Sequence, residues 1–296
     1  MAKPKGPVFG VDHLEPNALT VAELAKIRAL YNIPDFVVMQ IPGPLESLSN
    51  PETEVCFFTD VFKHGLRLPL RHSVQKILAQ IGYAPGQFNP NFWITLLGTI
   101  TAFGIAGEGE PSYEQFVNLY NVMRAKSADQ GGWVQSNCLA ASQKGHFVVE
   151  VSSSKKTWHK RWVLVSGAWE SAPGVVVERH IPTTFQTVVS LKWPIAPKRD
   201  VEAIERVREK IAKGDRFWKD LLDFGNLHKA GLITGAEHTR REKEKHEEEE
   251  RKKMAGGRPM NEATRRRLES RAPEQKKKKG GSSGSKTKPP CSARGA

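Results

Sequence analysis

Cysteine is scarce in this sequence. The 296 residues include only Cys56, Cys138 and Cys291, which lie far apart along the chain. Small secreted domains are held together by several cysteine pairs, and zinc sites need cysteines or histidines at short, fixed spacings. The three cysteines fit neither pattern. We therefore expect no disulfide framework and a chain that works in a reducing compartment.

Long apolar runs are missing as well. The longest covers residues 92–106 and is interrupted by glycine and threonine, whereas a membrane-spanning helix needs about 20 consecutive apolar residues. The first 16 residues contain prolines and charges but no apolar core of the kind a signal peptide has. We expect a soluble, intracellular protein with no membrane partner, in which residues 92–106 form a buried helix.

The sequence also lacks the spaced motifs of common enzymes. It has no phosphate-binding loop, no H-E-x-x-H, no C-x-x-C and no G-x-S-x-G, and the glycines at 104, 107 and 109 follow no strand. Cys138 and His146 are the nearest cysteine–histidine pair, and two ligands do not make a zinc site. We predict no cofactor, no metal and no catalytic residues. A transposase or nuclease with a dispersed acidic site remains the alternative.

Positive charge is concentrated at one end of the chain. The net charge is +13, yet residues 237–296 hold 19 Lys/Arg against 10 Asp/Glu, and the other 236 residues hold 26 against 22. The composition predicts a flexible leader over residues 1–18, a single globular domain over 19–236, and a charged, largely disordered basic tail over 237–296. Such a tail is attracted to polyanions, above all to nucleic acid.

Helical signals dominate the first half of the chain. Thr20 and Glu23 form a capping-box pattern that predicts a helix to about residue 31, and Asn89–Pro90 is typical of a helix start. Apolar residues at positions 74, 77, 78 and 81 follow helical spacing up to Gly82. We predict helices over about 20–31, 55–64, 73–81, 90–106 and 112–125.

The hydrophobic period changes after residue 132. The β-branched runs 147–151 and 161–165, separated by a polar segment, predict a β-hairpin, and residues 183–193 are a further candidate strand. Residues 200–214 are helical in pattern. The predicted fold class is α+β, with a mostly helical N-terminal half, a small antiparallel sheet, C-terminal helices and the tail.

Two regions are candidates for binding nucleic acid or a partner. Lys160 and Arg161 lie between Trp158 and Trp162. The tryptophans could stack on bases while the basic residues neutralise phosphates. Alternatively, the tryptophans belong to the core and the basic residues lie at the edge of the sheet. Basic clusters in the tail are the other candidate, because they neutralise phosphates and attract nuclear import receptors. These clusters are Arg251, Lys252 and Lys253; Arg265, Arg266 and Arg267; and Lys276, Lys277, Lys278 and Lys279.

The stretch "FKHGLRLPLRH" at residues 62–72 is unusual in composition. Gly65 can take a left-handed cap, and alternation directs Leu66, Leu68 and Leu70 to one side of an extended link. The stretch is therefore interpreted mainly as a joint between two helices. Arg67 points to the other side, and we predict that it contacts a ligand or partner.

Several of these motifs together resemble a known family. Residues 57–98 combine a helix ending in G-L-R-L-P-L, a short helix, a P-x-Q-x-x-P-N-x-W turn and an apolar helix, and "WHKRW" at 158–162 carries a later W-x-x-R-[FW] pattern. This arrangement, over about residues 55–170, resembles the plant family of gypsy-type transposon domain proteins.

The resemblance implies descent from retrotransposon coding sequence, from its gag-like part, and it brings no catalytic residues with it. The chain lacks a protease D-[ST]-G, a polymerase Y-x-D-D and the gag-type zinc knuckle, and the missing knuckle argues against the usual gag mode of RNA binding. We expect a non-enzymatic protein that associates with itself or a partner, binds nucleic acid non-specifically through its tail, and resides in the nucleus or cytoplasm, with the basic clusters favouring the nucleus. A remnant without selected activity is a further alternative.

Overall fold

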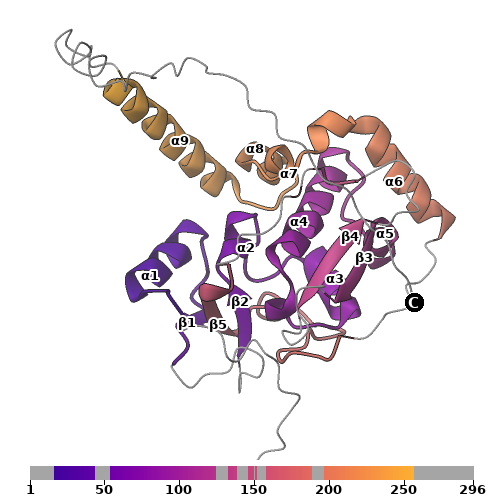
Figure 1. Ribbon diagram of the computed structural model, residues 1–296, viewed down its shortest axis with the longest axis horizontal. Coiled ribbons are helices and arrows are strands. Elements are labelled where there is room, and N and C mark those ends of the chain that lie inside the picture. The colour runs from indigo at the N-terminus through magenta and orange to yellow at the C-terminus, as the bar shows by residue number, and fades with distance from the viewer. Residues whose placement is uncertain are drawn as a thin grey trace, which may run out of the picture. The chain divides into compact units, whose positions relative to one another are not determined.

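A computed structural model describes residues 17–43, 54–124, 133–138, 146–149, 151, 158–188 and 197–256. The chain divides into two compact units, Met1–Lys245 and His246–Ala296. Helices and small antiparallel sheets make up the larger unit (Figure 1), which confirms the predicted α+β class. The candidate basic clusters at 265–267 and 276–279 lie outside the described residues.

The helices and strands occur in the following order along the chain. The helices are α1 Val21–Leu30, α2 Asp60–Lys63, α3 His72–Ile81, α4 Pro90–Ile105, α5 Tyr113–Leu119, α6 Lys198–Lys210, α7 Trp218–Leu221, α8 Phe224–Lys229 and α9 Gly235–Gly256. The strands are β1 Val37–Gln40, β2 Val55–Phe58, β3 Tyr120–Arg124, β4 Val134–Cys138 and β5 Trp162–Gly167. Among the residues that the structure describes, no helix is both long enough and apolar enough to cross a bilayer.

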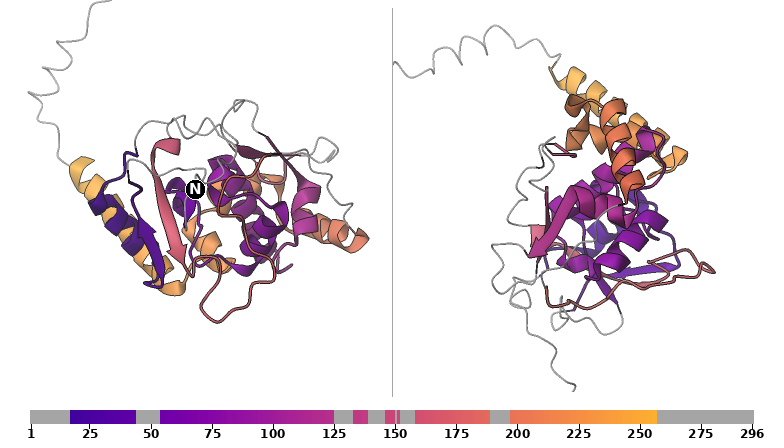
Figure 2. Two further views of the ribbon diagram at one scale, coloured as in Figure 1. Left: turned by 90° about the horizontal axis from the view of Figure 1, so that it is seen from below. Right: turned by 90° about the vertical axis from the view of Figure 1, so that its right-hand side faces the viewer.

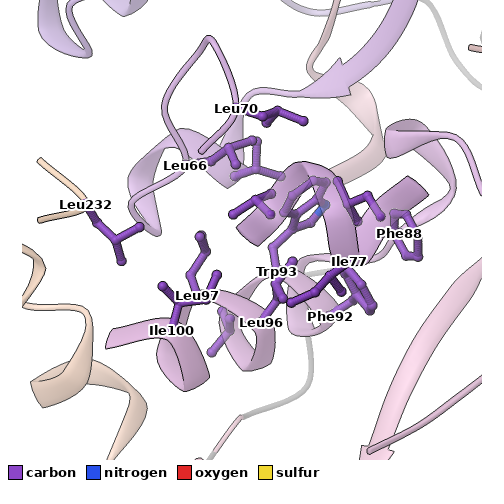
Figure 3. Packing of buried hydrophobic residues seen from close by; sticks show 14 of the residues in the cluster. Leu66, Leu70, Ile77, Phe88, Phe92, Trp93, Leu96, Leu97, Ile100 and Leu232 are labelled. Atoms are coloured by element: carbon purple, nitrogen blue, oxygen red, sulfur yellow. The ribbon is translucent and has the colours of Figure 1, made fainter. Parts of the chain in front are cut away.

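Helix α4 is the centre of the hydrophobic core. Asn89 caps it by accepting from the Phe92 N–H at 2.9 Å, and Pro90 occupies the first turn, as the sequence predicted. Nearly every side chain of α4 is buried, and Phe92, Trp93 and Leu96 are fully enclosed. Figure 3 shows Trp93 in the middle of a cluster that Leu66 and Leu70 also join. Burial on all sides explains why this helix carries no polar face.

The main sheet has the order β1-β5-β2, and both neighbours run antiparallel to β5. The predicted hairpin between 147–151 and 161–165 is therefore wrong. Strand β5 pairs with two strands from the N-terminal part of the chain, and Val149 instead forms an isolated parallel bridge with Phe217. The sequence identified a β-branched strand, but its partners lie more than a hundred residues away.

Two predicted helices are partly strand. Residues 55–58 form β2, whose side chains are all buried, and only Asp60–Lys63 is helical. The helix predicted over 112–125 ends at Leu119, and β3 follows and pairs with β4. Short apolar runs do not distinguish a buried strand from a buried helix, and the tertiary pairing decides between them.

The last predicted elements also differ. Helix α6 ends at Lys210 rather than at Gly214, and a 3-10 turn over Lys213–Arg216 follows. Residues 183–188 of the candidate strand are not in a sheet, and its remainder lies outside the described residues. The first turns of α9, which the sequence assigned to the tail, lie beside α1 within the larger unit (Figure 2).

Candidate functional site

A groove lies between α3 and the loop formed by residues 170–179. Its volume is about 640 Å³, which falls within the range of about 300–1,000 Å³ typical of ligand sites. We call it the α3 groove. It is lined by Pro69, Leu70, His72, Gln75, Lys76, Ala79, Gln80, Glu170, Ser171, Ala172, Val175, Val176, Val177, Glu178 and Arg179.

Helical periodicity gives α3 two different faces. Val74, Ile77, Leu78 and Ile81 pack into the core. The lining positions 72, 75, 76, 79 and 80 repeat with the same spacing on the other side of the helix. Gly82 ends the helix, as the sequence predicted, and it takes the left-handed conformation there. Of these positions, His72, Lys76 and Gln80 are exposed, whereas Gln75 and Ala79 are buried.

Glu170 fixes the loop against α3. Its carboxylate accepts from the Gln75 amide at 3.1 Å and from the Ile181 N–H at 2.7 Å, and it lies 2.6 Å from Nδ1 of His180. The Gln75 amide also donates to the Arg179 carbonyl at 2.7 Å. Both ends of the loop are thus held by one side-chain network. This network gives the second wall of the groove a defined position before any ligand arrives.

The middle of this loop is apolar and exposed. Val175 is 55% exposed and Val176 is 88% exposed. Val175 donates its N–H to Ala172, whereas Val176 and Val177 donate theirs to no other residue in the described part of the chain. Three consecutive β-branched residues favour an extended conformation. The loop therefore presents an exposed apolar segment along one side of the groove.

Arg67 does not face solvent. Its Nε donates to Glu237 Oε2 at 3.0 Å, Nη2 makes a second contact with the same carboxylate, and Nη1 donates to the carbonyls of Phe62 and Leu66. The guanidinium also lies 4.8 Å from the Tyr31 ring centre. With the Arg67 side chain 15% exposed and that of Glu237 2% exposed, these contacts give Arg67 a structural role that the sequence did not indicate.

Other arginines of α9 extend this contact. Arg240 donates to the carbonyl of Leu30 at 2.6 Å, and Arg241 lies over the rings of Tyr31 and Phe224. The start of the predicted tail is therefore part of the larger unit. Sequence reasoning missed Glu237 because a glutamate at the start of a charged helix resembles any other solvated residue. Its partner is 170 residues away.

The aromatic candidates of the second half are mostly core. Trp162 is buried in a cluster with Phe58, and Trp158 and Trp133 pack edge-on against Phe58. This packing favours the second of the two interpretations, in which the tryptophans belong to the core. Arg161 donates to Glu23 at 2.8 Å and holds the pKa of that carboxyl down, at about 2.

Lys160 and Arg161 take different positions around this cluster. Lys160 belongs to a 3-10 turn rather than to the strand, and its carbonyl accepts from the Ala18 N–H at 2.8 Å. Arg161 borders a small cavity of about 190 Å³, together with Lys26 and Lys63. Arg161 is thus paired with Glu23, and Lys160 lies in the turn that precedes β5.

The basic triplet Arg251, Lys252 and Lys253 lies in the last part of α9. Lys252 is 2.7 Å from Glu248, which raises the pKa of the lysine and lowers that of the glutamate. Arg251 donates to the carbonyl of Glu247. Over Gly235–Gly256 the sequence has seven basic and seven acidic residues, so α9 is neutral. The excess positive charge of residues 237–296 comes entirely from residues 257–296, with 12 Lys/Arg against three Asp/Glu.

Burial shifts the pKa of two further groups of the described core. His64 packs edge-on against Trp218, and burial lowers its pKa to about 4. Burial raises the pKa of the Cys56 thiol. Among the residues that the structure describes, no three or more His, Cys, Asp or Glu side chains gather in a way that could hold a metal ion.

No protein-family model, curated protein or solved structure matches this chain.

Proposed function

We propose that this chain is a non-enzymatic binding protein of the gag-like, transposable-element-derived type. Residues beyond Gly256 bind nucleic acid through charge, and the folded unit Met1–Lys245 associates with a protein. The likeness of residues 55–170 to gypsy-type transposon domain proteins supports the class. The spaced basic clusters favour the nucleus as its location.

The charge distribution is the observation that carries this proposal. Acidic neighbours neutralise the basic residues of α9, so only residues 257–296 retain a large excess of positive charge, a net of +9. A segment of this kind binds polyanions by releasing their counterions, and it requires no shaped site. Binding should therefore be insensitive to sequence and strongly dependent on salt.

Two triple variants of the full chain test the proposal. R265A/R266A/R267A removes three charges from the basic segment, and R251A/K252A/K253A removes three from the neutral helix. Affinity for a single-stranded oligonucleotide is measured by fluorescence anisotropy over a series of salt concentrations. The first variant should lower the slope of log K against log salt by about 2 to 3, because each phosphate contact contributes about 0.7–0.9.

The second variant is the matched control and should change the slope much less. Equal slopes for wild type and R265A/R266A/R267A would contradict the proposal. Cleavage of the oligonucleotide in the presence of magnesium would instead support the transposase or nuclease alternative. The same preparations thus separate simple binding from catalysis.

A further inference from the structure

We propose that a cavity on the folded unit binds a phosphate group. The cavity, which we call the α1 cavity, has a volume of about 190 Å³ and is lined in part by Lys26, Leu30 and Tyr31, by Lys63 of α2 and by Arg161. Sites for whole small molecules typically measure about 300–1,000 Å³, so this one suits a single phosphate group with little attached to it. The inference goes beyond the proposed function, because it assigns a binding site to the folded unit and does not depend on the basic tail.

Three cations from distant parts of the chain line the α1 cavity. Lys26 lies on α1, Lys63 lies on α2, and Arg161 directly precedes β5. The N–H of Thr59, at the start of α2, donates to the Arg161 carbonyl at 3.0 Å and joins α2 to β5. Lysine and arginine side chains bind phosphate oxygens through strong, charge-assisted hydrogen bonds. The position of these side chains therefore favours an anion as the ligand.

Glu23 also lines the cavity, but other donors already occupy its carboxylate. It accepts from the N–H and the hydroxyl of Thr20, both at 2.9 Å, and from Arg161 at 2.8 Å. A carboxylate has about four acceptor positions, so most of its capacity is in use. Glu23 is committed to the helix cap and to Arg161, and it leaves the remaining donors of the cavity to a ligand.

Lys26 is the cation that the chain leaves for a ligand. Lys63 is paired with Asp60, and Arg161 is paired with Glu23. These pairs lie at the surface, where ion pairs are weak. Lys26 is exposed and forms no ion pair in the described part of the chain. Three cations against two carboxylates give a net charge of +1 around the cavity, and Lys26 carries it.

The hydroxyl of Tyr31 is a second donor that the chain leaves for a ligand. Tyr31 lines the cavity and is only 6% exposed, yet among the described residues its hydroxyl has no hydrogen-bond partner. The hydroxyl of a buried tyrosine usually has one. The ring stacks on Phe62 at 5.8 Å and lies 4.8 Å from the Arg67 guanidinium. A phosphate oxygen in the cavity therefore finds a donor whose position is fixed in advance, which lowers the cost of binding.

Thermal unfolding of the full-length protein in potassium phosphate tests the site. A ligand that binds the native state raises the melting temperature with its concentration. Phosphate also stabilises proteins in a general way, so each protein is compared in phosphate and in potassium chloride at equal ionic strength. All variants keep the basic tail and experience the same general effect, so a difference between them reports on the cavity.

Lys26→Ala and Tyr31→Phe each remove one of the two donors, and Lys229→Ala is the matched control, because Lys229 is an exposed lysine on α8. Wild type and Lys229→Ala should show the same rise in melting temperature with phosphate. The phosphate Kd derived from this rise should increase about tenfold in Lys26→Ala and in Tyr31→Phe, because each loses a hydrogen bond to a charged group. Tyr31→Phe keeps the packed ring, so its melting temperature in chloride should stay close to that of wild type.

Equal phosphate-dependent rises in Lys26→Ala, Tyr31→Phe and Lys229→Ala would overturn the proposal. A single-stranded oligonucleotide then identifies the source of the phosphate. If nucleic acid supplies it, Lys26→Ala should lower the slope of log K against log salt by about 0.7 relative to Lys229→Ala. An unchanged slope, together with the loss of the phosphate effect, assigns the cavity to free phosphate or a phosphate monoester. Failure of the basic tail to bind nucleic acid would leave the phosphate result intact, so the two failures are distinguishable.

Discussion

Replacing Glu237 by alanine should strongly destabilise the larger unit, because it leaves the Arg67 guanidinium buried without its carboxylate. The Glu237 side chain is 2% exposed and that of Arg67 is 15% exposed. The carboxylate accepts from both Nε and Nη2 of the arginine. Removing one partner of a buried pair of this kind costs about 3–5 kcal/mol, most of which is the penalty of the remaining unpaired charge. A typical domain has a total free energy of unfolding of only about 5–15 kcal/mol.

The assay is urea unfolding of the full-length protein, followed by circular dichroism. Glu242→Ala is the control, because Glu242 lies on the same helix with its side chain half exposed, and its substitution should cost less than about 0.5 kcal/mol. The double variant Arg67→Met with Glu237→Ala should recover much of the lost stability, since no unpaired charge remains.

A loss below about 1 kcal/mol for Glu237→Ala would refute this account of the pair, given the cost expected for an unpaired buried charge. The account would also be refuted if the loss of stability of the double variant equalled the sum of the losses of the two single variants, because the effects of coupled residues are not additive. The sequence alone predicts that Arg67→Ala leaves the melting temperature nearly unchanged. The observed contacts predict a clear decrease.

Two further predictions concern the core. The pKa of His64 is about 4 in the folded state and about 6.5 in the unfolded state. Between these pH values the unfolded state binds a proton that the native state does not. The free energy of unfolding should therefore fall by about 1.4 kcal/mol per pH unit as the pH decreases from about 6.5 to 4. His64→Phe, which keeps a ring against Trp218, should remove this contribution from the pH dependence of urea unfolding, and identical slopes would contradict it. Gly104→Ala would place a Cβ 2.8 Å from that of Ala230, so it should lower the free energy of unfolding, measured by thermal unfolding, by about 1–3 kcal/mol. Gly235→Ala is the control and should be neutral, because its nearest contact would be at 3.6 Å. Equal effects of the two substitutions would show that α4 and α8 can separate.

Sequence reasoning was accurate where the signal is local. The capping box of Thr20 and Glu23, the Asn89–Pro90 start of α4 and the Gly82 end of α3 all occur as predicted. Each depends on residues within one turn of a helix. Prediction failed at 55–58, because a run of four apolar residues fits either a helix or a strand until a neighbouring strand is known. It also failed at 120–124, where pairing with β4 decides that the segment is a strand.

Half of the candidate site could be found in the same way. The positions 72, 75, 76, 79 and 80 follow from the helical period of α3, which also assigns the opposite face to the core. The other wall could not be found, since the contact between Gln75 and Glu170 joins residues 95 positions apart. Nothing in the local sequence of residues 170–179 indicates that the loop lies over α3.

The sequence by itself determined the starts of α1 and α4, the end of α3, the two faces of α3 and the separation of charge that leaves α9 neutral and residues 257–296 strongly basic. These properties depend on neighbouring residues and on composition. The tertiary structure decided which strands pair with β5, that Arg67 is buried against Glu237, and that a loop forms the second side of the groove. The physical reason is that each of these contacts joins distant parts of the chain, and only packing of the whole core brings them together.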